Sequence, residues 1–343
     1  MENKDIKILA IETSCDETAA AVVKNGREVL KNAVYSQIDI HKEYGGVVPE
    51  IASRNHVSKL PEVVDSVVEN MDEIDAVAVT CGPGLAGALI CGVAYAKALA
   101  YAAKKPLVAV NHIEGHISAN FISYPELKPP FLCLVVSGGH TYIVCVEDYC
   151  KYKLMGETRD DAAGEAIDKV SRVLGLPYPG GPNLEKLAEG GDRFAFEMPR
   201  SFKKESHLDF SFSGPKTTVI NMLHNMEQKG ESFSKKDMAA SFQHSIVSVL
   251  SDNTFEAARR TGAKKIAIAG GVSANKALRE EFVSRGKEKG IEIYMPNLCY
   301  CTDNAAMIGS AAYFRYIKGE RADMELNAYP MLTLEKTMNK VVK

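Results

Sequence analysis

The stretch Lys7–Ser36, KILAIETSCDETAAAVVKNGREVLKNAVYS, decides the fold. Its first five residues, of which all but Lys7 are apolar, are typical of a buried strand. The polar segment 12–18 leads into a second, mostly apolar strand at 19–24. Asn25-Gly26 is a preferred two-residue hairpin turn, after which the chain returns through residues 27–36. The sequence therefore predicts a strand, a polar turn and a β-hairpin.

The same order of features recurs in the second half of the chain. Residues 131–136 are an apolar run, residues 137–141 (SGGHT) form a turn, and a strand at 142–147 returns through 151–155. A structural duplication explains the recurrence.

The parts that follow each meander also correspond. An apolar strand at 75–80 leads through Gly82-Pro83-Gly84 into a helix of small residues at about 85–104. A strand at 265–269 leads through Gly270-Gly271 into a helix at about 274–289. Because each half combines a meander with strand–turn–helix units, we predict an α/β fold with mixed sheets.

The duplication predicts two lobes that face a central cleft. We place the first at 1–128 and the second at 129–343, with the last helices able to pack back on the first lobe. Prolines and glycines interrupt residues 176–236, which favours an irregular insertion over the cleft. Its basic and aromatic residues predict either RNA contact or a lid with a small core of its own. They are Arg200, Lys203, Lys204 and Lys216, and Phe194, Phe196, Phe202, Phe210 and Phe212.

Turns at matching places in the two halves indicate a phosphate-binding protein. They occupy residues 12–18, 82–87, 137–141 and 270–275, and the first contains no glycine. Glycine turns leave backbone N–H groups free and accessible, as a phosphate group requires. We therefore expect a nucleotide or an adenylate to bind here.

A metal site is the second chemical feature of the chain. His112 and His116 are four residues apart, so both imidazoles project from one face of a helix, and Asp303 supplies a distant carboxylate. This ligand set suits zinc or ferrous iron, although a buried histidine pair without a metal is the alternative. A metalloprotease is excluded because Glu114 lies two residues after His112, roughly 200° around the helix from the ligands.

The composition is that of an ordinary globular protein. The chain has 343 residues, 46% hydrophobic and 25% charged, with a formal charge of −3, so an RNA partner needs a local basic patch. No secretory segment and no apolar run near 18 residues is evident, which predicts a cytoplasmic protein without a membrane span. The eight cysteines form no C-x-x-C pair, so we expect buried free thiols, with Cys15, Cys299 and Cys301 as candidates for reactivity.

Seven motifs in order resemble the tRNA threonylcarbamoyladenosine biosynthesis transferases, the TsaD (YgjD/Gcp) family. The resemblance spans residues 8 to about 310, and an ordered series is far more specific than one glycine loop. The motifs are Glu12–Thr18 (ETSCDET), Gly82–Gly87 (GPGLAG), Asn111–His116 (NHIEGH), Val136–Thr141 (VSGGHT), Phe210–Gly214 (FSFSG), Gly270–Asn275 (GGVSAN) and Cys301–Met307 (CTDNAAM).

The resemblance implies an actin, heat-shock-chaperone and sugar-kinase (ASKHA, RNase H-like) fold. It implies transfer of a threonylcarbamoyl group from threonylcarbamoyl-AMP to the adenosine 3′ of the anticodon, in tRNAs that read codons beginning with A. It further implies one divalent metal, Fe(II) before Zn(II), a dimerising paralogue, TsaB, and a small ATPase, TsaE. The helix at 85–104 can pack against such a paralogue or against its own sheet.

The resemblance also assigns residues. The metal ligands are His112, His116 and Asp303, and the candidates for a general base are His140 and Glu12, from motif position only. Asp168 would accept hydrogen bonds from the ribose, although its amphipathic run equally suits a helix-surface acid. The substrate-binding residues are Val135, Val136, Ser137, Gly138, Gly139, Asp168, Gly181, Glu185 and Asn275.

Two residues depart from the family pattern, and two rival functions stay open. Pro215 stands where leucine is usual, and Glu185 where many bacterial members have aspartate. A small-molecule kinase or ATPase of the same fold would use acidic residues with magnesium and not a histidine pair. A non-catalytic paralogue would have no need of the three metal ligands.

Overall fold

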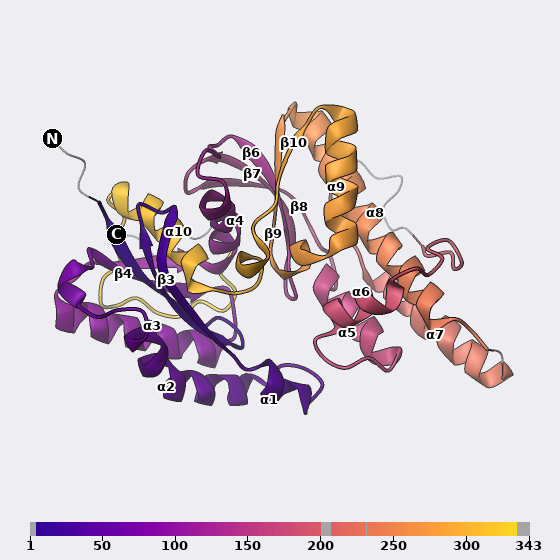
Figure 1. Ribbon diagram of the computed structural model, residues 1–343, viewed down its shortest axis with the longest axis horizontal. Helices are drawn as coiled ribbons and strands as arrows, with labels where there is room; N and C mark the ends of the chain where they lie inside the picture. The colour runs from indigo at the N-terminus through magenta and orange to yellow at the C-terminus, as the bar shows by residue number, and fades with distance from the viewer. Residues whose placement is uncertain (1–4, 200–206, 231, 335–343) are drawn as a thin grey trace. The chain divides into compact units, whose positions relative to one another are not determined.

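The computed structural model describes residues 5–199, 207–230 and 232–334 (Figure 1). Its first sheet is built around β1 (Lys7–Glu12), which pairs antiparallel with β2 (Glu17–Lys24) and parallel with β4 (Ala76–Gly82). β3 (Glu28–Ser36) and β5 (Leu107–Asn111) complete the order β3-β2-β1-β4-β5. The hairpin is confirmed, because Asn25 and Gly26 have φ angles of 52° and 69° between β2 and β3.

The second sheet repeats the first. It has the order β10-β9-β6-β7-β8, with β6 antiparallel to β7 and parallel to β9. Read from β8, this is the strand order of the first sheet, so the predicted duplication is confirmed. The strands are β6 (Phe131–Val136), β7 (Thr141–Asp148), β8 (Lys151–Glu157), β9 (Lys265–Ala269) and β10 (Glu292–Tyr294).

The chain divides into two compact units. The first contains the residues up to Pro129, the short segment Glu147–Tyr152 and the chain from Pro296 onward, and the second contains 130–146 and 153–295. The three predicted metal ligands therefore belong to the first unit, and the predicted substrate-binding residues to the second. The two-lobed arrangement around a cleft stays a prediction.

Helices cover both faces of the sheet in the first unit. Leu9 and Ile11 pack against the helices α2 and α3, whereas Ile8 and Ala10 pack against α10 on the opposite face (Figure 1). Because successive strand residues face opposite sides, a strand covered on both faces is apolar throughout. The helical segments are α1 (Ile38–Lys42), α2 (Pro49–Asp65), η1 (Met71–Glu73), α3 (Ala86–Ala103), α4 (His112–Ser123), η3 (Leu298–Tyr300) and α10 (Ala305–Ile317).

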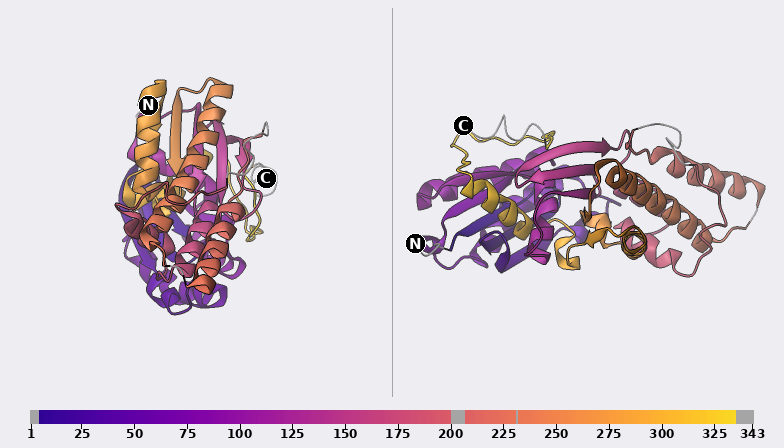
Figure 2. Two further views of the ribbon diagram at one scale, coloured as in Figure 1. Left: turned by 90° about the vertical axis from the view of Figure 1, so that its right-hand side faces the viewer. Right: turned by 90° about the horizontal axis from the view of Figure 1, so that it is seen from above.

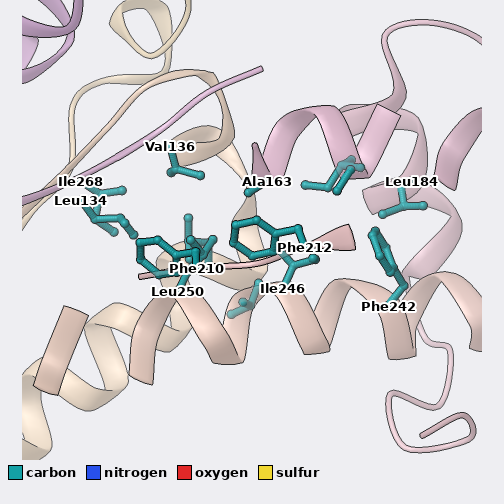
Figure 3. Close-up of a cluster of buried hydrophobic side chains, with 14 of the residues drawn as sticks. Leu134, Val136, Ala163, Leu184, Phe210, Phe212, Phe242, Ile246, Leu250 and Ile268 are labelled. Atoms are coloured by element: carbon teal, nitrogen blue, oxygen red, sulfur yellow. The ribbon is translucent and has the colours of Figure 1, made fainter. Parts of the chain in front are cut away.

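The second unit has its core between its sheet and the long helix α8. Leu134 and Ile268 of the sheet lie beside Ile246 and Leu250 of α8 (Figure 3). α8 has 27 residues and continues past the sheet toward α6 (Figures 1 and 2). The helical segments are α5 (Ala163–Val173), α6 (Gly180–Ala188), α7 (Ser213–Lys229), α8 (Lys235–Thr261), η2 (Gly271–Ala274) and α9 (Lys276–Lys289).

The prediction that residues 176–236 are irregular is wrong, whereas their place as an insertion over a cleft stays a prediction. This part of the chain contains α6 and α7, and its prolines and glycines lie where helices tolerate them. Pro182 and Pro215 are both the third residue of their helix, within the first turn, where a missing N–H removes no helical hydrogen bond. The departure at Pro215 therefore leaves the local backbone intact.

Aromatic residues of this region form a core, as one of the two alternatives expected. Phe210 and Phe212 are fully buried and their rings are stacked, so neither is available to an RNA base. Lys216 forms an ion pair with Asp161, whereas the side chain of Phe194 is exposed. The predicted RNA-contact residues Arg200, Phe202, Lys203 and Lys204 lie outside the described residues.

The expectation that no apolar run approaches 18 residues is also wrong. α3 has 18 residues and, by length and composition alone, could cross a membrane, but a core helix passes the same test. One face of α3 packs on the sheet through residues such as Leu89 and Val93, and Lys97 donates a hydrogen bond to the carbonyl of Leu326. About a third of the helix is buried, which leaves an apolar stripe exposed.

Candidate metal centre

The histidine pair lies at the start of α4, directly after β5. Asn111 caps the helix, its side-chain oxygen accepting hydrogen bonds from the amides of Ile113 (2.8 Å) and Glu114 (3.4 Å). This cap begins the helix at His112, so His112 and His116 project from the same face. Their ring centroids are 4.6 Å apart.

Asp303 reaches the same point from the residue before the cap of α10. One of its oxygens, Oδ1, lies 3.4 Å from Nε2 of His112 and 3.3 Å from Nε2 of His116. Asn304 caps the helix by accepting a hydrogen bond from the amide of Met307. The structure thus brings together all three predicted ligands, with their ligand atoms within 4.8 Å of one another.

The geometry and the chemistry of the three side chains fit a metal ion. Ligand atoms about 2.1 Å from a tetrahedral ion are about 3.4 Å apart, which matches the measured separations from Asp303 to the two histidines. Nδ1 of His116 is buried without a hydrogen-bond partner among the described residues, and Nε2 is buried with the Asp303 carboxylate at 3.3 Å as its polar neighbour. A buried polar atom without a partner is rare and indicates a missing ligand or ion.

Glu12 fixes the orientation of His112. Its Oε2 lies 3.2 Å from Nδ1 of His112 and accepts a hydrogen bond of 2.6 Å from the hydroxyl of Thr80. Oε1 accepts a hydrogen bond from the amide of Ser14, whose hydroxyl lies 3.0 Å from the same ring nitrogen. With Nδ1 occupied in this way, Nε2 of His112 is left for a metal.

The charges of this cluster set its protonation. Burial alone would lower the pKa of His112, but the carboxylates of Asp303 and Glu12 outweigh it and raise that pKa well above its usual value. Burial alone would raise the pKa of Asp303, but the two histidines hold it well below its ordinary range. Burial lowers the pKa of His116 and favours the neutral ring, the form that binds metals.

Glu114 faces away from the histidines, as its spacing predicted. Its carboxylate accepts hydrogen bonds from Arg315 and from the hydroxyl of Tyr152, and none of its hydrogen-bond partners is a predicted ligand. The exclusion of a metalloprotease therefore agrees with the geometry.

The two predicted phosphate-binding turns of the second unit lie next to each other. A Cβ on Gly270 would come within 2.4 Å of the carbonyl oxygen of Val136, so the turn at 270–275 packs on the end of β6. The amide of Ser137 donates to the carbonyl of His140, which closes the turn at 137–141. Gly138 and Gly139 are exposed, and a Cβ on either would meet nothing within 4 Å. Their backbone is therefore accessible to a ligand.

The other predicted substrate-binding residues gather at the start of α6 and α9. Asp168 of α5 accepts a hydrogen bond from the amide of Gly180 (2.8 Å), and Glu185 accepts one from the amide of Lys276 (2.6 Å). Asn275 caps α9 and donates to the side chain of Gln243 (3.1 Å). These polar groups thus join α5, α6, α8 and α9, and a Cβ on Gly181 would meet nothing within 4 Å.

The remaining candidates differ in their surroundings. The ring of His140 lies beside Tyr142, with centroids 5.6 Å apart. All eight cysteines are free thiols, as expected, but only Cys81, Cys133, Cys150 and Cys301 are buried. Cys299 is exposed, Cys15 is half-buried and Cys301 is buried.

Solved structures establish the class of fold. Over 91% of this chain, full-length HypF in its phosphate- and nucleotide-bound form superposes with a TM-score of 0.59 at 15% identity, over 46% of its own length. Component A of (R)-2-hydroxyglutaryl-CoA dehydratase from Acidaminococcus fermentans gives 0.54 at 16% identity, with 91% of this chain and 99% of that one covered. The protein therefore has the duplicated α/β fold of the ASKHA class.

Sequence comparison establishes the family. The sequence model described as TsaD, tRNA N6-adenosine threonylcarbamoyltransferase, matches residues 28–310. The transferase of this name from Clostridium novyi (strain NT) is 58% identical over 337 residues, 97% of this chain and 99% of its own. The transferase from Clostridium botulinum (strain 657 / Type Ba4) is 57% identical over 335 residues, which are 96% of this chain and 98% of its own. The chain belongs to the TsaD family, which confirms the resemblance and favours the transferase over a kinase of the same fold.

Proposed function

We propose that this protein transfers a threonylcarbamoyl group from threonylcarbamoyl-AMP to N6 of the adenosine 3′ of the anticodon, in tRNAs that read codons beginning with A. Family membership over most of the chain supports the reaction. The cluster of His112, His116 and Asp303 is the observation that carries the site. Because the substrate is a tRNA, we propose a cytoplasmic location.

The exposed turn at Gly138 and Gly139 receives the adenylate. Its amides lie at the end of β6, where they can donate hydrogen bonds to the phosphate and stabilise the charge that develops on it. Gly181, Glu185 and Asn275, at the adjoining ends of α6 and α9, surround the nucleoside. Asp168 supports this region by holding the amide of Gly180.

The reaction needs no nucleophile from the protein. The N6 amine of the adenosine attacks the carbonyl carbon of the threonylcarbamoyl group, the bond from that carbon to the phosphate oxygen breaks, and AMP leaves. The amine loses one proton. Because the adenylate is already activated, the protein contributes mainly by positioning both substrates.

The three ligands hold one divalent ion, iron or zinc, at the buried end of α4. When bound, the ion would supply a Lewis acid. Glu12 holds His112 in the tautomer whose Nε2 is free to bind the metal. Both carboxylate oxygens of Glu12 already accept hydrogen bonds, from Thr80 and from the amide of Ser14, which favours a positioning role over that of a general base. His140 is the remaining candidate for the base.

The reaction is tested with purified protein, the dimerising paralogue TsaB, the small ATPase TsaE, threonylcarbamoyl-AMP and unmodified tRNA. Mass spectrometry of the digested tRNA should show threonylcarbamoyladenosine. Asp303→Asn should abolish it, whereas Glu69→Gln, a change to an exposed carboxylate, should not. Absence of the modified nucleoside with the unchanged protein would refute the reaction, and full activity of Asp303→Asn would refute the metal site alone.

The paralogue docks on the exposed stripe of α3. Ala86, Ile90, Ala94, Ala98 and Tyr101 recur every three or four residues and are all exposed, with Ile90 at 54% and Tyr101 at 76%. A row of this kind suits the matching helix of a protein with the same fold, because small residues let two helices approach closely.

The docking surface is tested by gel filtration of the mixed proteins. Ile90→Asp with Tyr101→Asp should abolish co-elution with TsaB, and Ile317→Asp, at an equally exposed residue of α10, should not. Unchanged co-elution of the double variant with TsaB would show that the paralogue binds elsewhere. If the double variant instead loses a homodimer that the unchanged protein forms, the stripe binds a second copy of this chain.

A further inference from the structure

A buried ion pair joins the two helices that position the metal ligands. Glu114 lies in α4 between His112 and His116, and Arg315 lies in the last turn of α10, the helix that follows Asp303. Nε and Nη2 of Arg315 are 2.8 and 2.6 Å from Oε2 of Glu114. Both side chains are about 1% exposed, so the pair is fully removed from water.

The remaining polar atoms of this pair are also satisfied. Oε1 of Glu114 accepts a hydrogen bond of 3.0 Å from the hydroxyl of Tyr152, and Nη1 of Arg315 contacts Glu320. Burying an ion pair costs desolvation free energy, so the pair is weak evidence for added stability. Its expected effect is to select one arrangement of the two helices.

The same two helices are in close contact at a second point. A Cβ on Gly115 would come within 2.6 Å of Cδ1 of Ile308, so a larger residue there would force the end of the Ile308 side chain to move. The hydroxyl of Ser310 donates to the carbonyl of Ser118 at 3.2 Å. Ile308 and Arg315 are separated by seven residues, about 10 Å along a helix. Contacts this far apart fix both the tilt and the axial position of α10 on α4.

We propose that the Glu114–Arg315 pair is a positioning device for the metal centre, which sets the register of α10 against α4 and so holds Asp303 opposite the two histidines. The inference rests on the metal site of the proposed function. Neither residue touches a predicted ligand, and Glu114 acts from the face of α4 opposite to the histidines. An apolar pair of similar volume would pack there without fixing the register, because apolar contacts are not directional.

Cobalt(II) binding to the full-length protein tests the proposal. Glu114→Gln keeps the shape of the side chain and removes its charge. We expect it to weaken Co²⁺ binding by at least about threefold and to change the visible absorption of the bound ion. The loss should be smaller than the about 10- to 100-fold that follows removal of a direct hydrogen bond to a ligand, because Glu114 touches no predicted ligand. Glu320→Gln is the matched control, since it removes another partner of the same guanidinium without touching α4. It should leave the affinity and the spectrum unchanged.

Amide hydrogen exchange of the metal-free proteins gives a second readout. Residues 113–118 and 303–309 should exchange faster in Glu114→Gln than in the unchanged protein and in Glu320→Gln. Equal Co²⁺ affinity, spectrum and exchange in Glu114→Gln would overturn the proposal. If Glu114→Gln does not fold, Glu114→Met with Arg315→Met replaces it, and wild-type metal binding by that double variant would overturn the proposal equally.

The two readouts separate this inference from the proposed function. If the unchanged protein binds no Co²⁺, the metal site itself is refuted, and the exchange rates alone decide whether the pair sets the register. If the protein binds Co²⁺ and Glu114→Gln matches it in affinity, spectrum and exchange, the metal site stands and the positioning role is refuted.

Discussion

Glu12 and His112, 100 residues apart in the chain, meet with 3.2 Å between Oε2 and Nδ1. The carboxylate lies at the end of β1 and the imidazole at the start of α4. Metal-binding histidines usually donate their second ring N–H to such a carboxylate, which fixes the tautomer and strengthens the ligand. The contact joins the first motif of the chain to the histidine motif, so the polar turn without glycine would support the proposed metal ligand His112.

Glu12→Gln is expected to weaken metal binding by about 10- to 100-fold while the protein still folds. The amide has the same shape but no charge, so His112 loses the electrostatic part of its support. Thr80→Val should cause a smaller loss, because it removes one of the hydrogen bonds to Glu12. Thr80→Ser, which keeps the hydroxyl, should bind the metal as tightly as the unchanged protein. Titration of the apoprotein with Zn²⁺ measures each effect. Wild-type affinity in Glu12→Gln would show that His112 needs no such partner.

Removal of the metal is expected to lower the stability of the protein. An ion present at 100 times its dissociation constant stabilises the folded state by about 2.7 kcal/mol, provided that it does not bind the unfolded chain. Thermal denaturation with and without a chelator measures this difference, and added Zn²⁺ or Fe²⁺ should reverse it. Asp303→Asn should melt at one temperature under all these conditions. If the chelator does not change the melting temperature of the unchanged protein, the protein holds no tightly bound ion.

The cysteines are expected to differ strongly in their reaction with iodoacetamide at pH 8. Burial raises the pKa of Cys81 to about 12, so only about one molecule in ten thousand carries the reactive thiolate there. Burial also raises the pKa of Cys133. Cys299 is exposed and should be labelled first. Peptide mass spectrometry identifies the labelled residues, and Cys299→Ser should remove the fast phase. Equally fast labelling of Cys81 in the native protein would contradict the burial of β4.

The sequence predicted the strands and the histidine site because both depend on local patterns. The hairpin at Asn25-Gly26 follows from its turn residues, and the histidine pair follows from the helical repeat. Asp303 was found through the ordered motifs of a family. The contact from Glu12 to His112 and that from Glu114 to Arg315 join residues 100 and 201 positions apart, and no local pattern marks them.

The helices α6 and α7 were missed for a different reason. Pro182 and Pro215 read as helix breakers, but both lie in the first turn of a helix, where proline is tolerated. The position of a proline relative to the helix start, which the sequence left undefined, decides its effect. The burial of Phe210 and Phe212 was equally hidden, since a motif of alternating phenylalanines is compatible with stacking on RNA and with a core.

Two substitutions in the phosphate turn should separate ligand binding from folding. Gly139→Val places a side chain where a Cβ meets nothing within 4 Å, so the stability should change by less than about 0.5 kcal/mol. The added side chain would cover the amides that face the phosphate, and AMP should bind at least about tenfold more weakly. Calorimetry with AMP measures the affinity, and thermal denaturation measures the stability.

Gly164→Ala is the opposite case, because Gly164 lies in α5 and packs against the same turn. Its Cβ would lie 2.5 Å from the carbonyl oxygen of Ser137 and 2.8 Å from Cα of Gly138, so the backbone of the turn must move. We expect a loss of about 1–3 kcal/mol in stability together with weaker AMP binding, because overpacking a tight contact displaces both partners. If Gly139→Val binds AMP as tightly as the unchanged protein, the phosphate is held elsewhere. If only Gly164→Ala weakens AMP binding, the affinity depends on the shape of the turn and not on access to its open face.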